Sequence, residues 1–593
     1  MLLSDTLFGR FGDTVPREDV ATPNRPPIRE SLRQAWALAR PYWTSNARRS
    51  GLLFMVLTVG LTLFGVAMSV GLNKWSNNFY TALQEKNAAE VWHQLLVFSG
   101  LAFASIIAAV YRQFFQQRLT LIWREWMTQQ WLDDWLQGSA HWRIVTLKLR
   151  NDNPDQRITQ DISSFVGDTF GLMLSLLNAT VTLVSFVTLL WVLGGSLEFT
   201  LLGMNIVIPG FMVWAALIYA LAGSWLTYRI GRPLVRLNFL QERLEANFRY
   251  SLARVREHGE SIALQRGEKA EAAAAKSSFG EAVANTMRLI LRGKKLTWMN
   301  SFYGQTAIIA PFFFAMPRYL AGAFTFGTLM QISRAFGSVQ DALSWFVDAY
   351  ASVASWQATV QRLHGLSQSI EAARAHQRPV VETPSQDPPG DGASAPLHTR
   401  LAISTPDSVP LEAIPADITI APGELVLVEG PSGCGKSTWL RTLAGLWPHA
   451  SGEIHWPDGE RVFLPQKPYL PQGTLRAALA YPRTEADLDD DTARRLLNQV
   501  GLEALVDELD VADRWQDRLS LGEQQRLGFA RLLHQQPRWL FLDEATSALD
   551  PAAETRLYTL LFEALPGASV VSIGHRPGLR ELHGRVLRFA KQA

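Results

Sequence analysis

The sequence is poor in cysteine and nearly balanced in charge. Its 593 residues include one cysteine, Cys434, which excludes an internal disulfide framework and a multi-cysteine metal site. The net charge is only +2, so no global basic field points to nucleic acid as a partner. The first 50 residues hold no continuous apolar stretch, and the sequence therefore predicts no cleavable signal peptide.

Charged side chains are also missing from five long segments, at 51–72, 91–111, 169–197, 199–228 and 296–317. Each segment reaches the ~20 residues that a helix needs to span hydrocarbon. A sixth segment, 319–356, is longer and carries Arg334, Asp341 and Asp348. This pattern predicts an α-helical membrane domain with six transmembrane helices over residues 51–362.

Basic residues are distributed unevenly between the loops. Eight arginines precede the first span, seven Lys/Arg fall within 112–168 and fourteen within 229–295, whereas the intervening loops hold few. The positive-inside rule therefore places the N-terminus, both long loops and the C-terminal domain in the cytoplasm. We expect the membrane helices to continue into both long loops, because structureless loops of this length are uncommon.

Two segments flank the membrane domain. The N-terminal segment, 1–50, carries Leu32, Trp36 and Ala39 at helical spacing, which predicts a short interfacial helix on the membrane or an ordinary surface helix. The other segment, 363–400, loses its periodicity between 376 and 396, where proline, glycine and serine accumulate. This composition is typical of a flexible linker.

The C-terminal region, 401–593, has the pattern of an α/β domain. Short apolar runs at 424–429, 538–543 and 569–573 are typical of buried strands, and 436–446 of a helix. The first strand leads into GPSGCGKS (430–437), which fits the phosphate-loop pattern G-x-x-x-x-G-K-[ST]. The sequence therefore predicts a doubly wound P-loop domain that binds a nucleoside triphosphate.

The phosphate loop predicts the binding residues one by one. Gly433 and Gly435 would take backbone dihedrals that other residues resist, so that N–H groups turn toward the phosphates. Lys436 would place its charge between the β- and γ-phosphates, and Ser437 would bind Mg²⁺. The predicted ATP-binding set is Gly430, Pro431, Ser432, Gly433, Cys434, Gly435, Lys436, Ser437 and Thr438.

Four further residues are predicted to act at the γ-phosphate or its metal ion. Asp543 ends the apolar run LFLDE (540–544) and would hold Mg²⁺, while Glu544 would act as the general base for the attacking water. His575, after a strand in SIGH (572–575), lies where a γ-phosphate sensor is needed. Gln466 follows the short strand in FLPQ (463–466) and would reach both the metal and the water.

These runs, together with LSLGEQQ (519–525), resemble the nucleotide-binding domain of ABC transporters. The resemblance covers residues 423–576. It implies that Ser520 and Gly522 cap the γ-phosphate bound by a second subunit, and that Asp550 in SALD (547–550) belongs to the D-loop at the dimer seam. One such domain per chain implies a half-transporter that works as a homodimer and hydrolyses ATP to drive transport.

One feature departs from that family. Its members often stack adenine on an aromatic residue before the phosphate loop, but residues 401–429 contain no Phe, Tyr, Trp or His, and TPD (405–407) stands in the corresponding place. The adenine contact is therefore expected elsewhere. Cys434 needs no redox role, because the loop requires only a small residue there, and we expect its alkylation to block hydrolysis by bulk.

The membrane region is similar to one clade of half-transporters. The clade contains SbmA/BacA-like peptide-uptake proteins, their ATPase-bearing relatives linked to vitamin B12, bleomycin or antimicrobial peptides, and peroxisomal fatty-acyl-CoA transporters. The resemblance is carried by FYTALQ (79–84), WREW (123–126), DNPDQRI (152–158) with Asp161, EANFR (245–249), RVRE (254–257), ESIA (260–263), FLPQKPY (463–469) and GTLR (473–476). It implies an exporter-type, domain-swapped fold with six helices per chain, in which 245–260 forms the coupling segment.

Arg334, Asp341 and Asp348 share one helix face because they are seven residues apart. Ionisable groups within a span face a cavity or a partner rather than lipid. The three residues therefore either pair structurally with other helices or line a hydrophilic cavity for a large solute. Pro209 and Pro311 are expected to kink their helices.

The function expected from these features is ATP-driven uptake of bulky hydrophilic or amphipathic solutes, such as peptides or cobalamin, across the bacterial inner membrane. ATP and Mg²⁺ would be the cofactors, and a second copy, membrane lipid and the solute the partners. The alternatives are export of amphipathic compounds or acyl-CoA-type lipids, and a membrane ATPase that regulates without transport. A soluble ABC ATPase of nucleic-acid metabolism is disfavoured by the six apolar spans.

Overall fold

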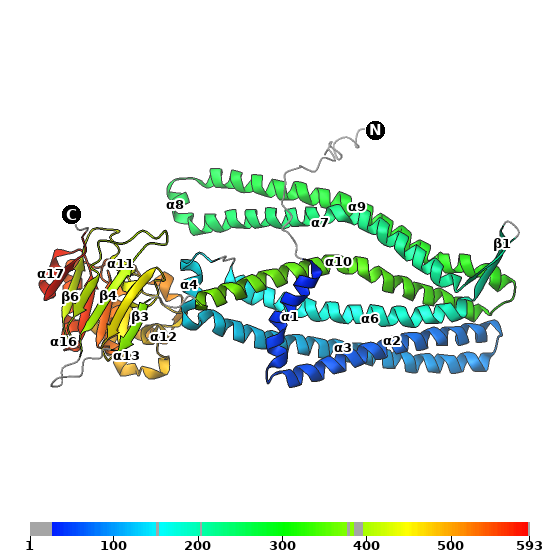
Figure 1. Ribbon diagram of the computed structural model, residues 1–593, viewed down its shortest axis with the longest axis horizontal. Coiled ribbons are helices and arrows are strands. Elements are labelled where there is room, and N and C mark those ends of the chain that lie inside the picture. The colour runs from blue at the N-terminus through cyan, green and yellow to red at the C-terminus, as the bar shows by residue number, and fades with distance from the viewer. Residues whose placement is uncertain (1–26, 150–152, 202–203, 376–379, 385–394, 591–593) are drawn as a thin grey trace. The chain divides into compact units, whose positions relative to one another are not determined.

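The computed structural model describes residues 27–149, 153–201, 204–375, 380–384 and 395–590, and the chain divides into two compact units. The first unit contains residues up to Leu132 together with Asn153–Leu366, and the second contains Asp133–Asp152 and Ser367–Ala593 (Figure 1). Residues 1–26 of the predicted N-terminal segment and Asp152 of the DNPDQRI run lie outside the described residues.

The first unit is a bundle of long helices. Its principal helices are α1 (Ile28–Thr44), α2 (Arg48–Gln84), α3 (Ala88–Leu136), α6 (Ile162–Gly194), α7 (Phe211–Glu257), α9 (Glu268–Leu320) and α10 (Phe326–Ala375). Shorter elements are η1 (Gln137–Ser139), α4 (Ala140–Thr146), α5 (Pro154–Gln156), the π-helical turn η2 (Arg157–Asp161) and α8 (Gly259–Leu264). All six predicted spans thus fall largely on long helices.

Four helical stretches in the described part of the chain are long and apolar enough to cross a membrane. They are Arg48–Gln84, Ala88–Thr146, Pro154–Gly194 and Phe211–Glu257. The helices α9 and α10 are similarly long, but neither contains a described stretch of the same apolar character. The charged residues of α10 include Arg334, Asp341 and Asp348, which interrupt the sixth predicted span.

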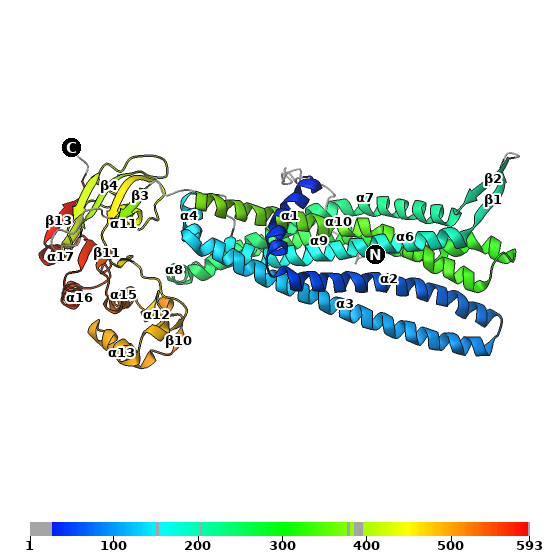
Figure 2. The ribbon, with the colours of Figure 1, turned by 60° about the horizontal axis from the view of Figure 1, so that its bottom comes forward.

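Two predicted span boundaries are wrong. The fourth segment does not begin as a helix, because β1 (Ser196–Leu201) and β2 (Met204–Pro209) pair as an antiparallel hairpin beyond the ends of α6 and α7 (Figure 2). Pro209 ends β2 and therefore kinks no helix, whereas Pro311 lies inside α9. The sixth segment also starts too early, since Tyr319 still belongs to α9 and the chain turns before Phe326.

Polar side chains join α2 to α10. The Asn73 amide donates to the Gln331 carbonyl oxygen over 3.1 Å, and the Asn77 amide donates to Gln331 Oε1 over 2.8 Å. At the last residue of α2, Gln84 Oε1 accepts a 2.8 Å bond from the backbone N–H of Phe326. Asn73 and Gln331 are both buried, so the contact fixes the start of α10 against α2.

The long loops continue the membrane helices, as predicted. In Figure 1, α7 and α9 run side by side and diverge from α6 and α10 toward α8, which joins them. The predicted coupling segment, 245–260, covers the end of α7 and the start of α8. Its role in coupling stays a prediction.

The second unit contains two sheets. Five parallel strands follow the order β13-β6-β12-β11-β8, and a four-stranded sheet follows the order β3-β7-β4-β5. The strands are β3 (Val380–Pro384), β4 (Leu397–Ile403), β5 (Asp417–Ile420), β6 (Leu425–Glu429), β7 (Ala450–Trp456), β8 (Arg461–Leu464), β11 (Trp539–Asp543), β12 (Ser569–Ile573) and β13 (Arg585–Arg588), with a small pair formed by β9 (Gly473–Thr474) and β10 (Ala512–Asp513). The prediction of a flexible linker is wrong for Val380–Pro384, because these residues form a strand that pairs with β7.

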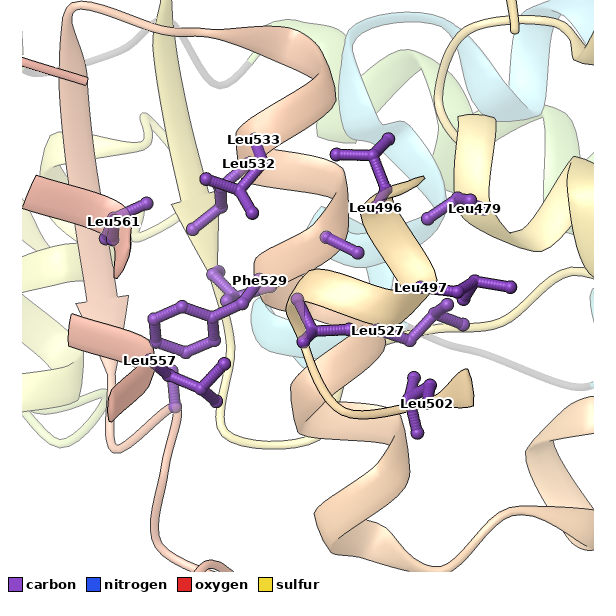
Figure 3. Packing of buried hydrophobic residues seen from close by; sticks show 14 of the residues in the cluster. Leu479, Leu496, Leu497, Leu502, Leu527, Phe529, Leu532, Leu533, Leu557 and Leu561 are labelled. Carbon is purple, nitrogen blue, oxygen red and sulfur yellow. The ribbon is translucent and has the colours of Figure 1, made fainter. Parts of the chain in front are cut away.

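Helices and a leucine-rich core complete this unit. The helices are α11 (Lys436–Leu443), α12 (Leu475–Ala480), α13 (Asp490–Gln499), α14 (Trp515–Arg518), α15 (Leu521–Gln535), α16 (Pro551–Ala564) and α17 (Pro577–Leu582), with η4 (Glu485–Asp487) and η5 (Glu503–Glu508). Figure 3 shows Leu497 and Leu527 packed between α13 and α15, with Phe529 of α15 facing Leu557 of α16. Burial of these side chains anchors α15, whose first turn carries the LSLGEQQ run.

Candidate active site

The predicted phosphate loop connects β6 to α11. Glu429 ends the strand, Lys436 begins the helix, and the loop between them contains Gly433 at φ 78° and Gly435 at φ 105°. The predicted dihedrals are thus confirmed. A Cβ on Gly435 would lie 3.0 Å from the side chains of Leu411 and Ile414, so the loop lies against these residues and admits only glycine there.

Lys436 has its ammonium group over this loop. Its Nζ donates to the carbonyl oxygens of Gly430, at 2.8 Å, and Pro431, at 3.0 Å, and the side chain is buried. Since α11 also directs its N-terminal N–H groups into the loop, positive charge and amide donors converge on one concave stretch of backbone. This arrangement fits the phosphates of ATP.

Ser437 and Asp543 form the candidate magnesium site. Ser437 Oγ donates to Asp543 Oδ1 over 2.9 Å. Burial raises the pKa of Asp543, the nearby Glu544 charge adds to this, and the bond from Ser437 opposes it. Both groups offer the hard oxygen atoms that Mg²⁺ prefers, with room left for water and phosphate oxygens, so the residues present fit this ion.

Glu544 lies between Gln466 and His575, as the sequence predicted for the γ-phosphate end. Gln466 Nε2 donates to Glu544 Oε2 over 3.1 Å, and His575 Nε2 lies 3.5 Å from Glu544 Oε1. The backbone of Glu544 has φ 48°, and its N–H donates to the carbonyl oxygen of Ile573, two residues before His575. Three strand ends thus deliver one carboxylate, one amide and one imidazole to a common point.

Ser520 and Gly522 lie at the N-terminus of α15. The Ser520 side chain caps the helix by accepting from the Glu523 N–H, and Glu523 accepts from Ser520 in return. In the described part of the chain, no hydrogen bond links Ser520 or Gly522 to the phosphate loop. Their contact with a nucleotide bound by a second copy stays a prediction.

Asp550 has a local partner. Its Oδ1 accepts hydrogen bonds from the N–H groups of Ala552, at 3.0 Å, and Ala553, at 2.9 Å, and so caps α16. These bonds lower the pKa of Asp550. The carboxylate is therefore a helix cap first, and its contribution to the nucleotide site stays a prediction.

Two residues that sequence reasoning missed connect these loops. Gln525 Nε2 donates to the Gln466 carbonyl oxygen at 2.9 Å and to Ser547 Oγ at 3.1 Å. Arg576 Nη1 donates to the Leu549 carbonyl oxygen at 2.5 Å, and Nη2 donates to that of Ser547 at 2.9 Å. Gln525 belongs to the LSLGEQQ run and Arg576 follows His575, so adjacency to those motifs was the available signal.

The TPD run forms a turn instead of presenting a ring. The Thr405 N–H donates to the Val409 carbonyl oxygen over 2.9 Å, and Ser408 has φ 63°. Trp447 is bonded to the residue before this turn, since its indole N–H donates to the carbonyl oxygen of Ser404 over 2.9 Å. This tryptophan lies outside the 401–429 stretch in which an aromatic was expected.

A parallel sheet that carries a phosphate loop, fused to a bundle of long apolar helices, defines the class of ATP-binding-cassette membrane proteins. The family model for the ABC transporter transmembrane region 2 matches residues 38–320, and the model for the ABC transporter ATPase matches residues 415–547. The chain belongs to the ABC transporter family. It is a half-transporter in which one membrane domain is fused to one ATPase domain.

Similar proteins cover nearly the whole chain. An uncharacterized ABC transporter ATP-binding protein of Haemophilus influenzae is 36% identical over 94% of this chain and 92% of its own length. The inner membrane ABC transporter ATP-binding protein YddA of Escherichia coli is 31% identical over 94% and 97%. The human lysosomal cobalamin transporter ABCD4 is 27% identical over 93% and 92%.

The fold is that of an ABC exporter. The structure of a bacterial Atm1-family ABC exporter with ATP bound covers 92% of this chain and 94% of its own, with a TM-score of 0.69 at 18% identity. The predicted helical membrane domain, ABC ATPase domain and ATP-hydrolysing activity are thereby confirmed. The chain is also similar to the ABC transporter D family member 2 of Arabidopsis thaliana, at 31% identity. The predicted links to peroxisomal fatty-acyl-CoA transporters and to SbmA/BacA-like proteins stay predictions.

Proposed function

We propose that two copies of this chain form a transporter that imports bulky hydrophilic or amphipathic solutes, such as peptides or cobalamin-like molecules, across a bacterial inner membrane. The observation that carries the proposal is the convergence of Gln466, Glu544 and His575 beside the phosphate loop, in a chain that carries a single ATPase domain. An inner-membrane relative and a cobalamin-transporting relative support the location and the solute class.

The proposed chemistry follows from the contacts. Lys436 and the loop N–H groups bind the phosphates of ATP, and Ser437 and Asp543 hold Mg²⁺. When bound, Mg²⁺ neutralises charge on the phosphate oxygens. Glu544 accepts a proton from the attacking water, while Gln466 and His575, one on each carboxylate oxygen, keep its orientation.

Dimerisation completes each site in this proposal. Ser520 and Gly522 of the second copy donate to the γ-phosphate, since the start of α15 is the positive end of the helix dipole. Closing of the two ATPase domains then changes the arrangement of the membrane helices through the α7–α8–α9 hairpin. We assign the ATPase domain to the cytoplasmic side from the distribution of Lys and Arg.

Flux in oriented vesicles tests the proposal. Purified chain is reconstituted, and ATP-dependent movement of labelled cobalamin, peptide and acyl-CoA is measured. Glu544→Gln should bind ATP but lose at least about 100-fold in hydrolysis and all flux, because it lacks the proton acceptor. Glu563→Gln, an exposed carboxylate on α16, is the matched control and should behave as the wild type.

Export is the second candidate, favoured by the exporter fold. Vesicle orientation separates the two directions. An importer accumulates solute only in vesicles that hold the ATPase domains and ATP inside, whereas an exporter accumulates it only in vesicles whose ATPase domains face outward. ATP hydrolysis that Glu544→Gln abolishes, without flux of any solute in either orientation, would overturn transport in favour of a regulatory ATPase.

A further inference from the structure

Three charged side chains of α10 face away from the packed side of that helix. Arg334, Asp341 and Asp348 are all exposed, whereas Ala335, Phe336, Val339, Ala342 and Ala349 are buried. Over the described part of the chain, none of the three forms an ion pair. Since a charge within a span must face a cavity or a partner, this face of α10 is polar for a reason other than packing.

Two stacked tyrosines lie next to Asp341, the middle residue of these three, which we call the charged stripe of α10. The rings of Tyr219 on α7 and Tyr303 on α9 have centroids 4.5 Å apart and an interplanar angle of 10°. Tyr219 Oη donates to the Tyr303 carbonyl oxygen over 2.5 Å. The stack is therefore fixed by both ring contact and a hydrogen bond.

Gly223 provides the space for this stack. It lies one turn after Tyr219 on α7, and a Cβ at this position would lie 2.2 Å from Cε2 of Tyr303. The Tyr303 ring thus rests directly on the backbone of α7. Any larger residue at 223 would displace the ring, so the sequence supports one placement of Tyr303.

Asp341 belongs to the same group of side chains. The tyrosine pair lies against α10, because the Tyr219 ring centroid is 6.1 Å from that of Phe336, and the Asp341 carboxylate on this helix acts electrostatically on the Tyr303 phenol. An acid and two aromatic rings, contributed by three helices, therefore lie together in the membrane domain. A carboxylate and aromatic faces are the two groups that attract organic cations in proteins.

We propose that Asp341, Tyr303 and Tyr219 form a binding subsite for a positively charged group of the transported solute, an ammonium or a guanidinium. This inference rests on the proposed transport function. A cation would compensate the Asp341 charge, which lacks an ionic partner among the described residues. Arg334 and Asp348 lie about 10 Å away on either side along the helix.

The charge of this stripe also favours some of the proposed solutes over others. It has one positive and two negative groups, so it matches a peptide that carries a positive charge, with Arg334 available to a carboxylate about 10 Å away. A polyanionic acyl-CoA would meet net negative charge instead. The inference therefore narrows the proposed function to solutes with cationic groups.

Paired peptide probes test the subsite. A short lysine-containing peptide and the same peptide with acetylated lysines are compared with the full-length protein, by fluorescence anisotropy without ATP and by flux with ATP. Wild type should bind the lysine peptide about 10-fold more tightly than the acetylated peptide, and Asp341→Asn should remove that preference. Asp341→Glu should keep the preference for the lysine peptide, and Gly223→Ala should weaken this preference by displacing Tyr303.

Glu85→Gln, an exposed acid at the end of α2, is the matched control and should keep the preference. Equal affinity of wild type for the two peptides, or an unchanged preference in Asp341→Asn, would overturn the subsite. If either of these two results is obtained while another solute of the panel still moves with ATP, the transport function stands and only the subsite is refuted. If nothing moves but Asp341 still sets the peptide preference, the subsite stands and transport falls.

Discussion

Arg362 of α10 and Asp161, the last residue of the π-helical turn before α6, form a two-point ion pair. Arg362 Nε donates to Asp161 Oδ2 over 2.8 Å, and Nη2 donates to Oδ1 over 2.7 Å. Arg157 Nη1 also donates to Oδ2 over 2.8 Å. One buried carboxylate thus serves two guanidinium groups from distant parts of the chain, in a π-helical turn of the kind often found at functional positions.

Removal of that carboxylate should destabilise the membrane domain. Asp161→Asn is expected to cost about 3–5 kcal/mol, because a buried ion pair is broken on one side only. Arg362→Lys should cost less, since it keeps the charge and loses the two-point geometry. The midpoint of thermal unfolding in detergent measures both. Asp155→Asn, exposed two residues before Arg157, is the control, and equal midpoints for all variants would contradict the prediction.

Arg576 should position the loop that follows Glu544. Arg576→Met removes the two bonds to the carbonyl oxygens of Ser547 and Leu549 and should lower kcat for ATP about 10-fold, with little change in KM. The reason is that Ser547 also contacts Gln466 and Gln525. Arg576→Lys should recover part of the rate. Arg495→Met on α13 is the control, and a change in KM alone would argue for a direct role in ATP binding.

Alkylation of Cys434 should block hydrolysis. Its Sγ lies 4.0 Å from Lys436 Nζ within the phosphate loop, so an added maleimide would occupy the space of the phosphates. Because the chain has one cysteine, stoichiometric labelling is unambiguous, and ATP should slow it. Cys434→Ser should keep its activity under the same treatment. Full modification with unchanged ATPase activity would refute the steric role.

Acid should destabilise the ATPase domain through His583. Burial lowers the pKa of this imidazole from its ordinary value of 6.5, against the opposing effect of the bond to the Leu579 carbonyl oxygen. The unfolded chain therefore binds the proton more readily than the folded one, and stability present above pH 6.5 falls as the pH drops below it. Unfolding midpoints between about pH 8 and pH 5 measure this.

His583→Gln should make the unfolding midpoint less dependent on pH, even if the variant unfolds at a lower midpoint than wild type at every pH. Its imidazole Nε2 lies 2.9 Å from Ser572 Oγ, so the substitution also tests whether this buried contact contributes. His258→Gln, at an exposed histidine before α8, should keep the wild-type slope. An unaltered slope in His583→Gln would assign the acid sensitivity to other groups.

Local patterns predicted the ATPase strands well. The run 569–573 is β12 to the residue, and β6 and β11 differ from their predicted ranges by one residue at the start. The helix after the phosphate loop is shorter than predicted, since it ends at Leu443 and Gly445 adopts φ 68°. Short apolar runs bounded by loop motifs specify buried strands with little help from the rest of the chain.

The β1–β2 hairpin and β3 could not be predicted in the same way. An uncharged run such as 199–228 has no feature that separates a strand from the start of a membrane helix, because both bury apolar side chains. Val380–Pro384 is a strand because β7 is available beside it, which its own composition does not show. The contacts of Gln525 and Arg576 likewise depend on the meeting of distant loops.

The polar contact between α2 and α10 has a consequence for biosynthesis. Asn73 and Asn77 are made early, but their partner Gln331 is synthesised about 250 residues later. Until then, the first membrane helix carries two amides whose final partners do not exist. Until α10 has been made, water or lipid headgroups must serve as partners for these two amides, and α2 gains its final polar contacts only after the last membrane helix has been inserted.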